Sequence, residues 1–392
     1  MKRAKCLGVL LLFLLFFGIF CGIDCVLVSA STDASAAELN NAVLDQLTKL
    51  DLQALEAYVK SLEGFESKSV KELLTEYIVG GGFGYENFFL ELCEIVFANA
   101  KKLLPSFACI AAVGLLCGIL NSLQSRYLGE STAKVVFFVA YLGTLLPTLA
   151  VLTEGISVSK SSVGEMRQQM QLVFPIMLTM IAASGGSVSA AIFQPAVGFL
   201  CNTLIALVEQ IVFPITIAII VFSISGKLFG DLKTEKFSAF FKSINKWLIG
   251  IAVSVFALFF TVQGITAATY DGIVRRAAKY AIGTGVPIVG GFLSGGFDLA
   301  IAGSILIKNA LGNFSLVILV SILLQPLSVL IATNVLLRLS AAITQPFGDN
   351  KIASFLEETA ENLQFCTAGV LFSAFLYFVA ILIMVFASGI FL

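Results

Sequence analysis

The sequence predicts an all-α, polytopic helical membrane protein with about nine transmembrane segments, some of them broken by glycine or proline. Two observations support this fold class. Of the 392 residues, 58% are hydrophobic and 12% are charged, and the mean hydropathy is +0.98, whereas soluble domains contain about 25% charged residues. Apolar segments of about 20 residues, the length that crosses a bilayer as a helix, also recur along the chain.

The composition excludes several function classes. The formal net charge of −1 and the lack of a run of like charges give no reason to expect a nucleic-acid partner. Histidine is absent, which excludes histidine-based triads and histidine metal sites. The cysteines have neither zinc-site nor redox-pair spacing, and no Gly-x-x-x-x-Gly-Lys-Ser/Thr loop for ATP occurs. We therefore expect no enzyme, no cofactor and no metal.

Residues 1–30 are predicted to be a signal peptide. Three basic residues (Lys2, Arg3 and Lys5) precede an apolar run at 7–23, and Val28-Ser29-Ala30 has the small residues of a cleavage site. The alternative is an uncleaved first span. In either interpretation, the segment that follows residue 30 lies outside the cytoplasm.

Residues 31–102 are predicted to be an exported helical region. Between Asp33 and Glu94 there are twelve acidic residues and four lysines, and apolar residues recur with helical spacing. Ser69 and Glu72 have the spacing of a capping box that opens a helix. Two interpretations remain open, namely a helical cap packed on the membrane domain and a docking surface for a partner outside the membrane.

Residues 103–392 form the predicted polytopic membrane domain. Its apolar segments lie at 103–123, 133–153, 170–187, 188–208, 210–226, 247–269, 285–307, 314–337 and 369–392. With the exported region outside, the loops 121–134, 184–187, 227–246 and 308–313 and the carboxyl terminus are expected inside. Loop 227–246 supports this topology, because it carries five lysines and only two acidic residues.

In this topology the basic triplet Arg275, Arg276 and Lys279 lies outside, on the side opposite the lysine-rich loop. Apolar residues around it can share one side of a helix while the three basic residues take the other. We therefore expect an interfacial helix that anchors to lipid headgroups, with contact to an acidic partner as the alternative.

Glycine is concentrated in the stretch GTGVPIVGGFLSGGFD at 283–298. Each glycine in a helix interior costs about 1 kcal/mol relative to alanine, so close packing of helices or a helix break should compensate. We expect 283–303 to face other helices or another subunit, as a pore or packing element with Asp298 directed inward. The four glycines that we expect to matter are Gly290, Gly291, Gly295 and Gly296.

Ionisable residues in the predicted spans are few. Glu209 and Asp298 are the two that could lie at depth, and neither has an evident basic partner nearby in the sequence. Such residues are usually functional, because a charge at the bilayer centre costs at least about 2.5–3.5 kcal/mol. Glu209 is expected at a turn near the interface, and Asp298 is the stronger functional candidate.

Four sequence blocks resemble the stage III sporulation protein AE family of endospore-forming bacteria. These are GGSVSAAIFQPAVGFLCNT at 185–203, TVQGITAATYDGIVRRAAKYAIGTGVPIVGG at 261–291, LIKNALG at 306–312 and QPFGD at 345–349. The resemblance implies a mother-cell protein of the outer forespore membrane. It also implies other stage III sporulation operon proteins as partners, and stage II sporulation protein Q across the intermembrane space. It transfers no catalytic residue.

Two functions therefore remain open. The first is a membrane subunit of the channel complex between mother cell and forespore, acting as conduit or membrane base and supporting late forespore gene expression, as a homo-oligomer in the bilayer. The second is a secondary transporter, or permease, for a small solute. Helices broken by glycine or proline are typical of transporters. The small number of ionisable residues in the predicted spans instead favours the subunit of the channel complex.

Overall fold

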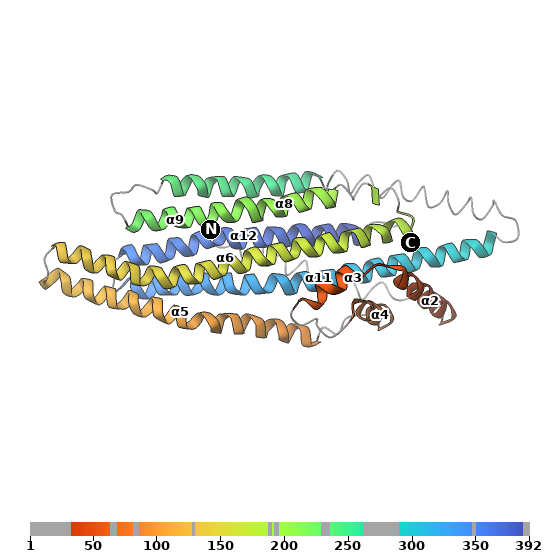
Figure 1. Cartoon of the computed structure of the whole chain (residues 1–392), viewed down its shortest axis with the longest axis horizontal. Helices are drawn as coiled ribbons and strands as arrows, with labels where there is room; N and C mark the ends of the chain where they lie inside the picture. Colours follow the sequence, from red (N-terminus) through yellow and green to blue (C-terminus); the bar gives the residue numbers. More distant parts are fainter. Residues whose placement is uncertain are drawn as a thin grey trace.

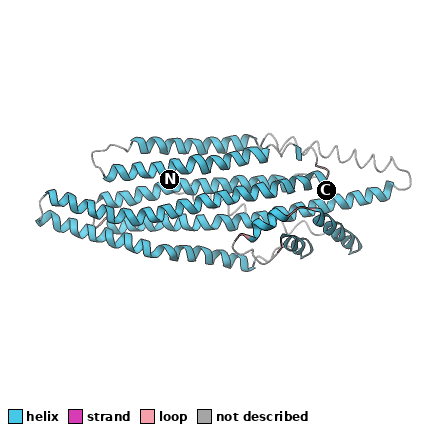
Figure 2. Cartoon of the chain, viewed as in Figure 1, coloured by secondary structure: helices cyan, strands magenta, loops and turns pink. Residues whose placement is uncertain are grey.

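The computed structural model describes the chain between residues 33 and 386, apart from 63–68, 81–85, 128–129, 187–189, 192–195, 229–235, 260, 262–289 and 347–349. Over these residues the fold is a long bundle of helices, mostly antiparallel, and no strand occurs in the described part (Figure 2). The all-α prediction is confirmed. The predicted signal peptide at 1–30 and the basic triplet Arg275, Arg276 and Lys279 lie outside the described residues.

The helices differ greatly in length (Figure 1). Three short ones come first: α2 (Asp33–Lys49), α3 (Gln53–Lys60) and α4 (Val70–Gly80). The bundle itself contains α5 (Glu86–Tyr127), α6 (Glu130–Ala183), the π-helix η1 (Ala196–Cys201), α8 (Asn202–Leu207), the π-helix η2 (Val208–Val212), α9 (Phe213–Leu228), an unlabelled helical segment Lys236–Phe259, α11 (Gly290–Thr344) and α12 (Asn350–Phe386).

Six helical segments of the described residues are long and apolar enough to cross a membrane: Phe97–Leu116, Tyr141–Ala183, Phe199–Gly226, Lys236–Phe259, Ala300–Thr344 and Ile352–Phe386. The sequence analysis expected about nine. The difference arises because three pairs of expected spans are joined. Segment 133–153 and residues 170–183 of the next segment both lie in α6. The described residues 196–226 of the following two segments form one helical run, and residues 290–307 and 314–337 both lie in α11.

The predicted loop at 308–313 does not exist. These residues lie inside α11, where Lys308, Ala310 and Leu311 are buried. Proline does not break the long helices either, since Pro147 and Pro175 lie within α6 and Pro326 within α11. Neighbouring helices can satisfy the backbone groups that a proline frees inside a membrane bundle.

The helix ends divide the bundle into two sides. The end of α5 and the start of α6 lie toward one end of the bundle, as do the end of α9 with the start of Lys236–Phe259 and the end of α11 with the start of α12, whereas α2–α4 lie toward the other end (Figure 1). The end of α6 and the described end of α12 lie on the α2–α4 side. The sequence analysis placed loop 184–187 and the carboxyl terminus opposite the exported region, whereas in the described fold the ends of α6 and α12 lie toward α2–α4. The reason for the difference is that two expected spans form the single helix α6. The expected number of crossings before residue 184 therefore falls by one, which moves the residues after α6 to the other side.

Gly185 ends α6. Its φ of 85° is in the left-handed region that glycine adopts without strain. The N–H of Gly186 donates to Ile181 O at 2.9 Å, and that of Gly185 donates to Ala182 O at 3.0 Å. This is a Schellman motif, which satisfies the last carbonyl groups of the helix and lets the chain turn back.

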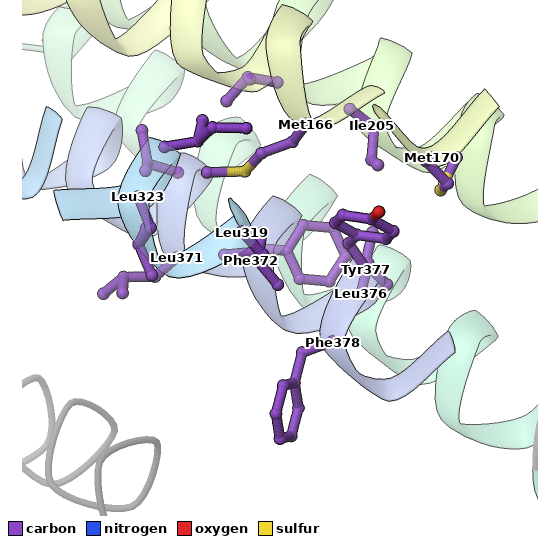
Figure 3. Packing of buried hydrophobic residues seen from close by; sticks show 14 of the residues in the cluster. Met166, Met170, Ile205, Leu319, Leu323, Leu371, Phe372, Leu376, Tyr377 and Phe378 are labelled. Atoms are coloured by element: carbon purple, nitrogen blue, oxygen red, sulfur yellow. The ribbon is translucent and has the colours of Figure 1, made fainter. Parts of the chain in front are cut away.

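The core lies between α6, α11 and α12. Met166 and Met170 of α6 approach Ile205 of α8, Leu319 of α11 and Tyr377 of α12 (Figure 3). The ring of Tyr377 also packs against Phe174, with 5.6 Å between centroids. The outer helices α5 and Lys236–Phe259 bury far less of their apolar surface than α11 and α12. This difference is expected if α11 and α12 are central and the outer helices face lipid or partners.

Helices α2–α4 pack on the bundle, as the helical-cap interpretation predicts. Their apolar residues Val43, Leu47, Leu55, Val59 and Leu74 belong to the main core cluster. Polar contacts reinforce the packing: Gln46 Nε2 donates to Ala300 O at 3.0 Å, Tyr58 Oη donates to Glu165 O at 3.0 Å, and Asn313 bonds Tyr77. Burial and the Glu165 carboxylate hold the pKa of Tyr58 well above its usual value, so its hydroxyl remains a donor.

The start of α4 and the extent of α5 complete this region. The predicted capping box has formed in part, since the N–H of Ser69 donates to Glu72 Oε2 at 3.3 Å.

The predicted division after Lys102 falls inside α5. Gly114 of α5 lies against Thr344 at the end of α11. Because α5 continues to Tyr127, the α5–α6 hairpin projects about 20 Å beyond the α11–α12 turn.

Candidate functional site: a polar cluster between α6, α8 and η2

Glu209 lies in a continuous helical run rather than at a turn, so that expectation was wrong. It belongs to the π-helix η2, which leads directly into α9. The N–H of Phe213 reaches back to Val208 O, five residues earlier, as a π-turn requires. Pro214 follows and has no N–H to donate. The wider turns accommodate this proline without ending the helix.

Glu209 has a basic partner on the neighbouring helix. Arg167 Nη1 of α6 lies 3.5 Å from Glu209 Oε2, and the two side chains are 30% and 22% exposed. Arg167 Nε donates to Asn202 Oδ1 at 2.6 Å, and Gln171 Nε2 donates to the same oxygen at 3.3 Å. These four side chains, Arg167, Gln171, Asn202 and Glu209, form a cluster that we call the α6–η2 polar cluster.

Helical spacing explains why the cluster forms. Arg167 and Gln171 are four residues apart, so they lie one turn apart on the same face of α6. Asn202 and Glu209 are seven residues apart, which places them two turns apart on one face of the α8–η2 run. Two polar residues from each helix therefore meet over the same stretch.

The sequence analysis missed Arg167, which lies 42 residues before Glu209. It assigned 154–169 to a connection between two spans, where a charge has no cost. A signal was nevertheless present. Four polar residues, Arg167, Gln168, Gln169 and Gln171, precede the apolar end of α6 without a glycine or proline that would end the helix.

The same part of α6 also holds two other neighbours. Gln169 is fully buried, and its Nε2 donates to Ser315 O of α11 at 3.0 Å. Glu165 accepts the Tyr58 hydroxyl through its backbone oxygen. Within seven residues, α6 is thus tied to α3, α11 and the α8–η2 run.

A second inter-helix ion pair lies nearer the other end of the bundle. Lys242 Nζ is 3.2 Å from Glu358 Oε1 of α12, and both side chains are mostly buried. Close by, Asn245 Nδ2 donates to Thr216 Oγ1 of α9 at 2.9 Å. These bonds attach the helix Lys236–Phe259 to α9 and α12, so both ion pairs connect helices.

Among the remaining predicted residues, Asp298 and the glycines Gly290, Gly291, Gly295 and Gly296 lie in the first turns of α11. Their side-chain surroundings lie outside the described part. Lys308, which the sequence analysis placed in a loop, is fully buried in α11. It lies between Ser304, which contacts Gln46, and Asn313, which contacts Tyr77.

The described residues offer little for catalysis or metal binding. No group of three or more His, Cys, Asp or Glu residues capable of holding a metal is found among them. Cys201 and Cys366 are buried free thiols, whereas Cys109 is exposed. The polar cluster joins α6 to the α8–η2 run through an ion pair and amide hydrogen bonds, and this is the chemistry that its arrangement supports.

Comparison with known proteins agrees with the sequence blocks. The family model for stage III sporulation protein AE matches residues 68–388. The chain is 25% identical over 377 residues to "Stage III sporulation protein AE" of Bacillus subtilis (strain 168), covering 93% of this chain and 94% of that protein. No solved structure matches the chain. With a family model that covers most of its length, the chain belongs to the stage III sporulation protein AE family and is a sporulation protein.

Proposed function

We propose that this chain is an integral membrane subunit of the assembly that connects mother cell and forespore, serving as a conduit or as the membrane base of that assembly. Family membership supports the sporulation role. The observation that carries the structural role is the joining of α2–α4 to a bundle with six candidate spans. A base needs such a rigid connection between an exposed region and the membrane.

In this proposal the chain lies in the outer forespore membrane, and α2–α4 face the intermembrane space. The acidic, partly exposed surface of these helices is available there to proteins from the same operon and to stage II sporulation protein Q. Lys227 in the last turn of α9 and Lys236 at the start of the following helix belong to helix ends that lie near the opposite end of the bundle, which supports a cytoplasmic position for that end.

The permease alternative is not favoured. A proton-coupled transporter needs a membrane group whose charge state changes during transport. Glu209 is instead engaged by Arg167 and helps to join two helices. The proposed subunit has no catalytic residue of its own.

The proposal is tested by complementation and capture. The full chain, tagged and expressed from its mother-cell promoter, should restore sporulation to cells lacking their own copy. It should also be recovered in a complex with operon proteins and stage II sporulation protein Q. Restored sporulation with no complex would exclude the role as a base, and ion-coupled uptake of a solute by the purified chain would favour the permease.

The position of α2–α4 is tested separately with Ser61, which is exposed at the end of α3. In protoplasts prepared before engulfment is complete, while the intermembrane space is still continuous with the medium, a membrane-impermeant thiol reagent should label Ser61→Cys. Labelling that begins only when the reagent enters the cytoplasm would contradict the proposed orientation.

A further inference from the structure

Two fully buried asparagines lie at one contact between three helices. They are Asn245 of the segment Lys236–Phe259 and Asn362 of α12, and both have 0% exposure. About one turn before them, Lys242 Nζ lies 3.2 Å from Glu358 Oε1 and joins the two helices. Both helices begin toward the same end of the bundle (Figure 1), so the residues three and four positions after this ion pair lie at about the same level.

Helical spacing directs both asparagines into this contact. Asn245 follows Lys242 by three residues, which places it on the face of its helix that carries the ion pair. Asn362 follows Glu358 by four residues, which has the same effect in α12. The third helix is α9, because Asn245 Nδ2 donates to Thr216 Oγ1 at 2.9 Å.

The side chains at this contact have hydrogen-bonding capacity that the described residues leave unused. Neither the Oδ1 nor the Nδ2 of Asn362 has a partner among them, and Asn245 Oδ1 accepts from no donor there. The hydroxyl of Thr359, three residues before Asn362 and also buried, is unbonded in the same part of the chain. We call Asn245, Thr359 and Asn362 the asparagine site.

Similar side chains elsewhere in the bundle show how such groups are ordinarily bonded. The buried hydroxyls of Thr148 and Thr216 each donate to a carbonyl group four residues earlier in the chain. Asn334 Nδ2 of α11 donates across a helix contact to Ala360 O at 2.5 Å. A buried polar group without a partner loses its hydration and gains no bond in return. The asparagine site therefore calls for a small ligand that both donates and accepts.

The available atoms favour water over an ion. A cation would suit Asn245 Oδ1 but would meet the N–H groups of Asn362, and the Lys242 ammonium group lies about one turn away. An anion would meet the Glu358 carboxylate, which is one turn away in α12. Water is both a donor and an acceptor, and a buried water molecule typically makes about three hydrogen bonds to such groups.

We propose that the asparagine site binds ordered water, which bridges Asn362 to Asn245 and Thr359 and so attaches the outer helix Lys236–Phe259 to α12. The neighbouring ion pair is on the same side, and its two side chains are 23% and 27% exposed. Water exchanges with the solvent past this pair. The inference goes beyond the proposed function, because it holds for a conduit and for a membrane base alike.

The site is tested by X-ray radiolysis of the full chain in lipid nanodiscs. A short pulse forms hydroxyl radicals from water, and water bound inside the protein oxidises the side chains beside it. Cys366 is the reporter, because it is a buried thiol one turn after Asn362. Met177 is the control in apolar surroundings, since it is fully buried and its methyl group lies against Gly312. Cys109 is exposed and reports radicals from the bulk solvent.

After correction for the intrinsic reactivities of the two side chains, we expect Cys366 to be oxidised at least tenfold faster than Met177. A radical scavenger in the solution should slow the oxidation of Cys109 and leave that of Cys366 unchanged. Equally slow oxidation of Cys366 and Met177 would identify a dry contact, and suppression of Cys366 oxidation by the scavenger would identify access from the bulk solvent. Either result overturns the bound water.

The variant Asn362→Leu gives a second test, because it removes the polar atoms and nearly keeps the volume. It should lower the oxidation rate of Cys366 at least fivefold, leave that of Met177 unchanged and lower the unfolding temperature. A rise in the unfolding temperature would instead show that the amide was buried without a partner, and would overturn the proposal. If the variant does not fold, the comparison of Cys366 with Met177 in the unmodified chain still decides.

A last measurement separates water from a cation. Replacing sodium with choline at constant ionic strength should leave the unfolding temperature of the unmodified chain unchanged. A shift in that temperature would identify a bound cation at the asparagine site if Asn362→Leu removes it, and would overturn the assignment to water.

Discussion

Single residues hold this bundle together where two helices meet. Arg167 is the clearest case, because one guanidinium contacts both Asn202 and Glu209. The sequence predicted that Glu209 is unusual but could not predict its partner, since helix neighbours distant in sequence are set by packing. Gly312 is a second case, since α12 lies so close that a Cβ there would clash with Val385.

Removing the guanidinium of Arg167 should destabilise the bundle. Arg167→Ala leaves Glu209 without this donor and leaves Asn202 Oδ1 with Gln171 as its donor. A lost hydrogen bond to a charged group costs about 1.5–3 kcal/mol. In thermal unfolding in detergent, the double variant Arg167→Ala/Glu209→Gln should lose less stability than the sum of the losses in the two single variants. Gln168→Ala is the control, because that side chain is exposed. Strict additivity would show that the pair contributes nothing.

Gly312→Ala should destabilise the contact between α11 and α12. The new methyl group overlaps a methyl of Val385, and overpacking of this kind costs about 1–3 kcal/mol. Val385→Ala should restore much of the loss in the double variant. Gly164→Ala has open space around its Cβ and should instead gain up to about 1 kcal/mol from helix propensity. Equal unfolding temperatures for both alanine variants would refute the close approach.

At the scale of elements, helix type could be predicted and helix continuity could not. Apolar periodicity and the Ser69–Glu72 spacing predicted helices in 31–102, and the capping contact is present. The joining of spans in α6 and α11 was missed, because polar residues such as Gln169 and Lys308 read as loop signals. In the fold they are buried by other helices, which a single sequence does not reveal.

Helix α3 should come away from the bundle when its apolar side is truncated. Leu55 is 1% exposed, and a buried leucine changed to alanine costs about 2–5 kcal/mol. Leu55→Ala should speed limited proteolysis within residues 31–102 by at least tenfold, while the core of α11 and α12 stays protected. Gln53→Ala, on the exposed side of the same helix, should cleave at the rate of the unmodified chain. Identical rates for both variants would argue against a docked cap.

On the scale of the whole molecule, the number of crossings decides which ends share a side. Composition was sufficient to predict a helical membrane protein, but the span count depended on whether short polar stretches interrupt helices. If the six candidate spans of the described residues are the crossings, the described end of α12 lies on the side of α2–α4, whereas nine crossings would separate them. The family blocks pointed to sporulation, since they reflect ancestry rather than local physics.

A reporter can measure this difference. Alkaline phosphatase, which is active only outside the cytoplasm, should be active when fused after Leu392, on the same side as Ser61→Cys. Gln345→Cys, exposed at the α11–α12 turn, should be labelled by an impermeant reagent only after permeabilisation. An inactive fusion together with a labelled Ser61→Cys would show that the chain crosses the membrane an odd number of times after Ser61.

The projecting α5–α6 hairpin constrains how the molecule stands in lipid. Its exposed Leu116, Ile119 and Val139 need apolar surroundings beyond the point where α11 ends, whereas Glu357 and Glu361 near the start of α12 are exposed charges. A flat bilayer perpendicular to the helices cannot suit both, so the molecule should lean or thin the lipid on one flank. Copies that share such a deformation lower its cost by clustering. Assembly should therefore weaken in bilayers whose thickness removes the mismatch.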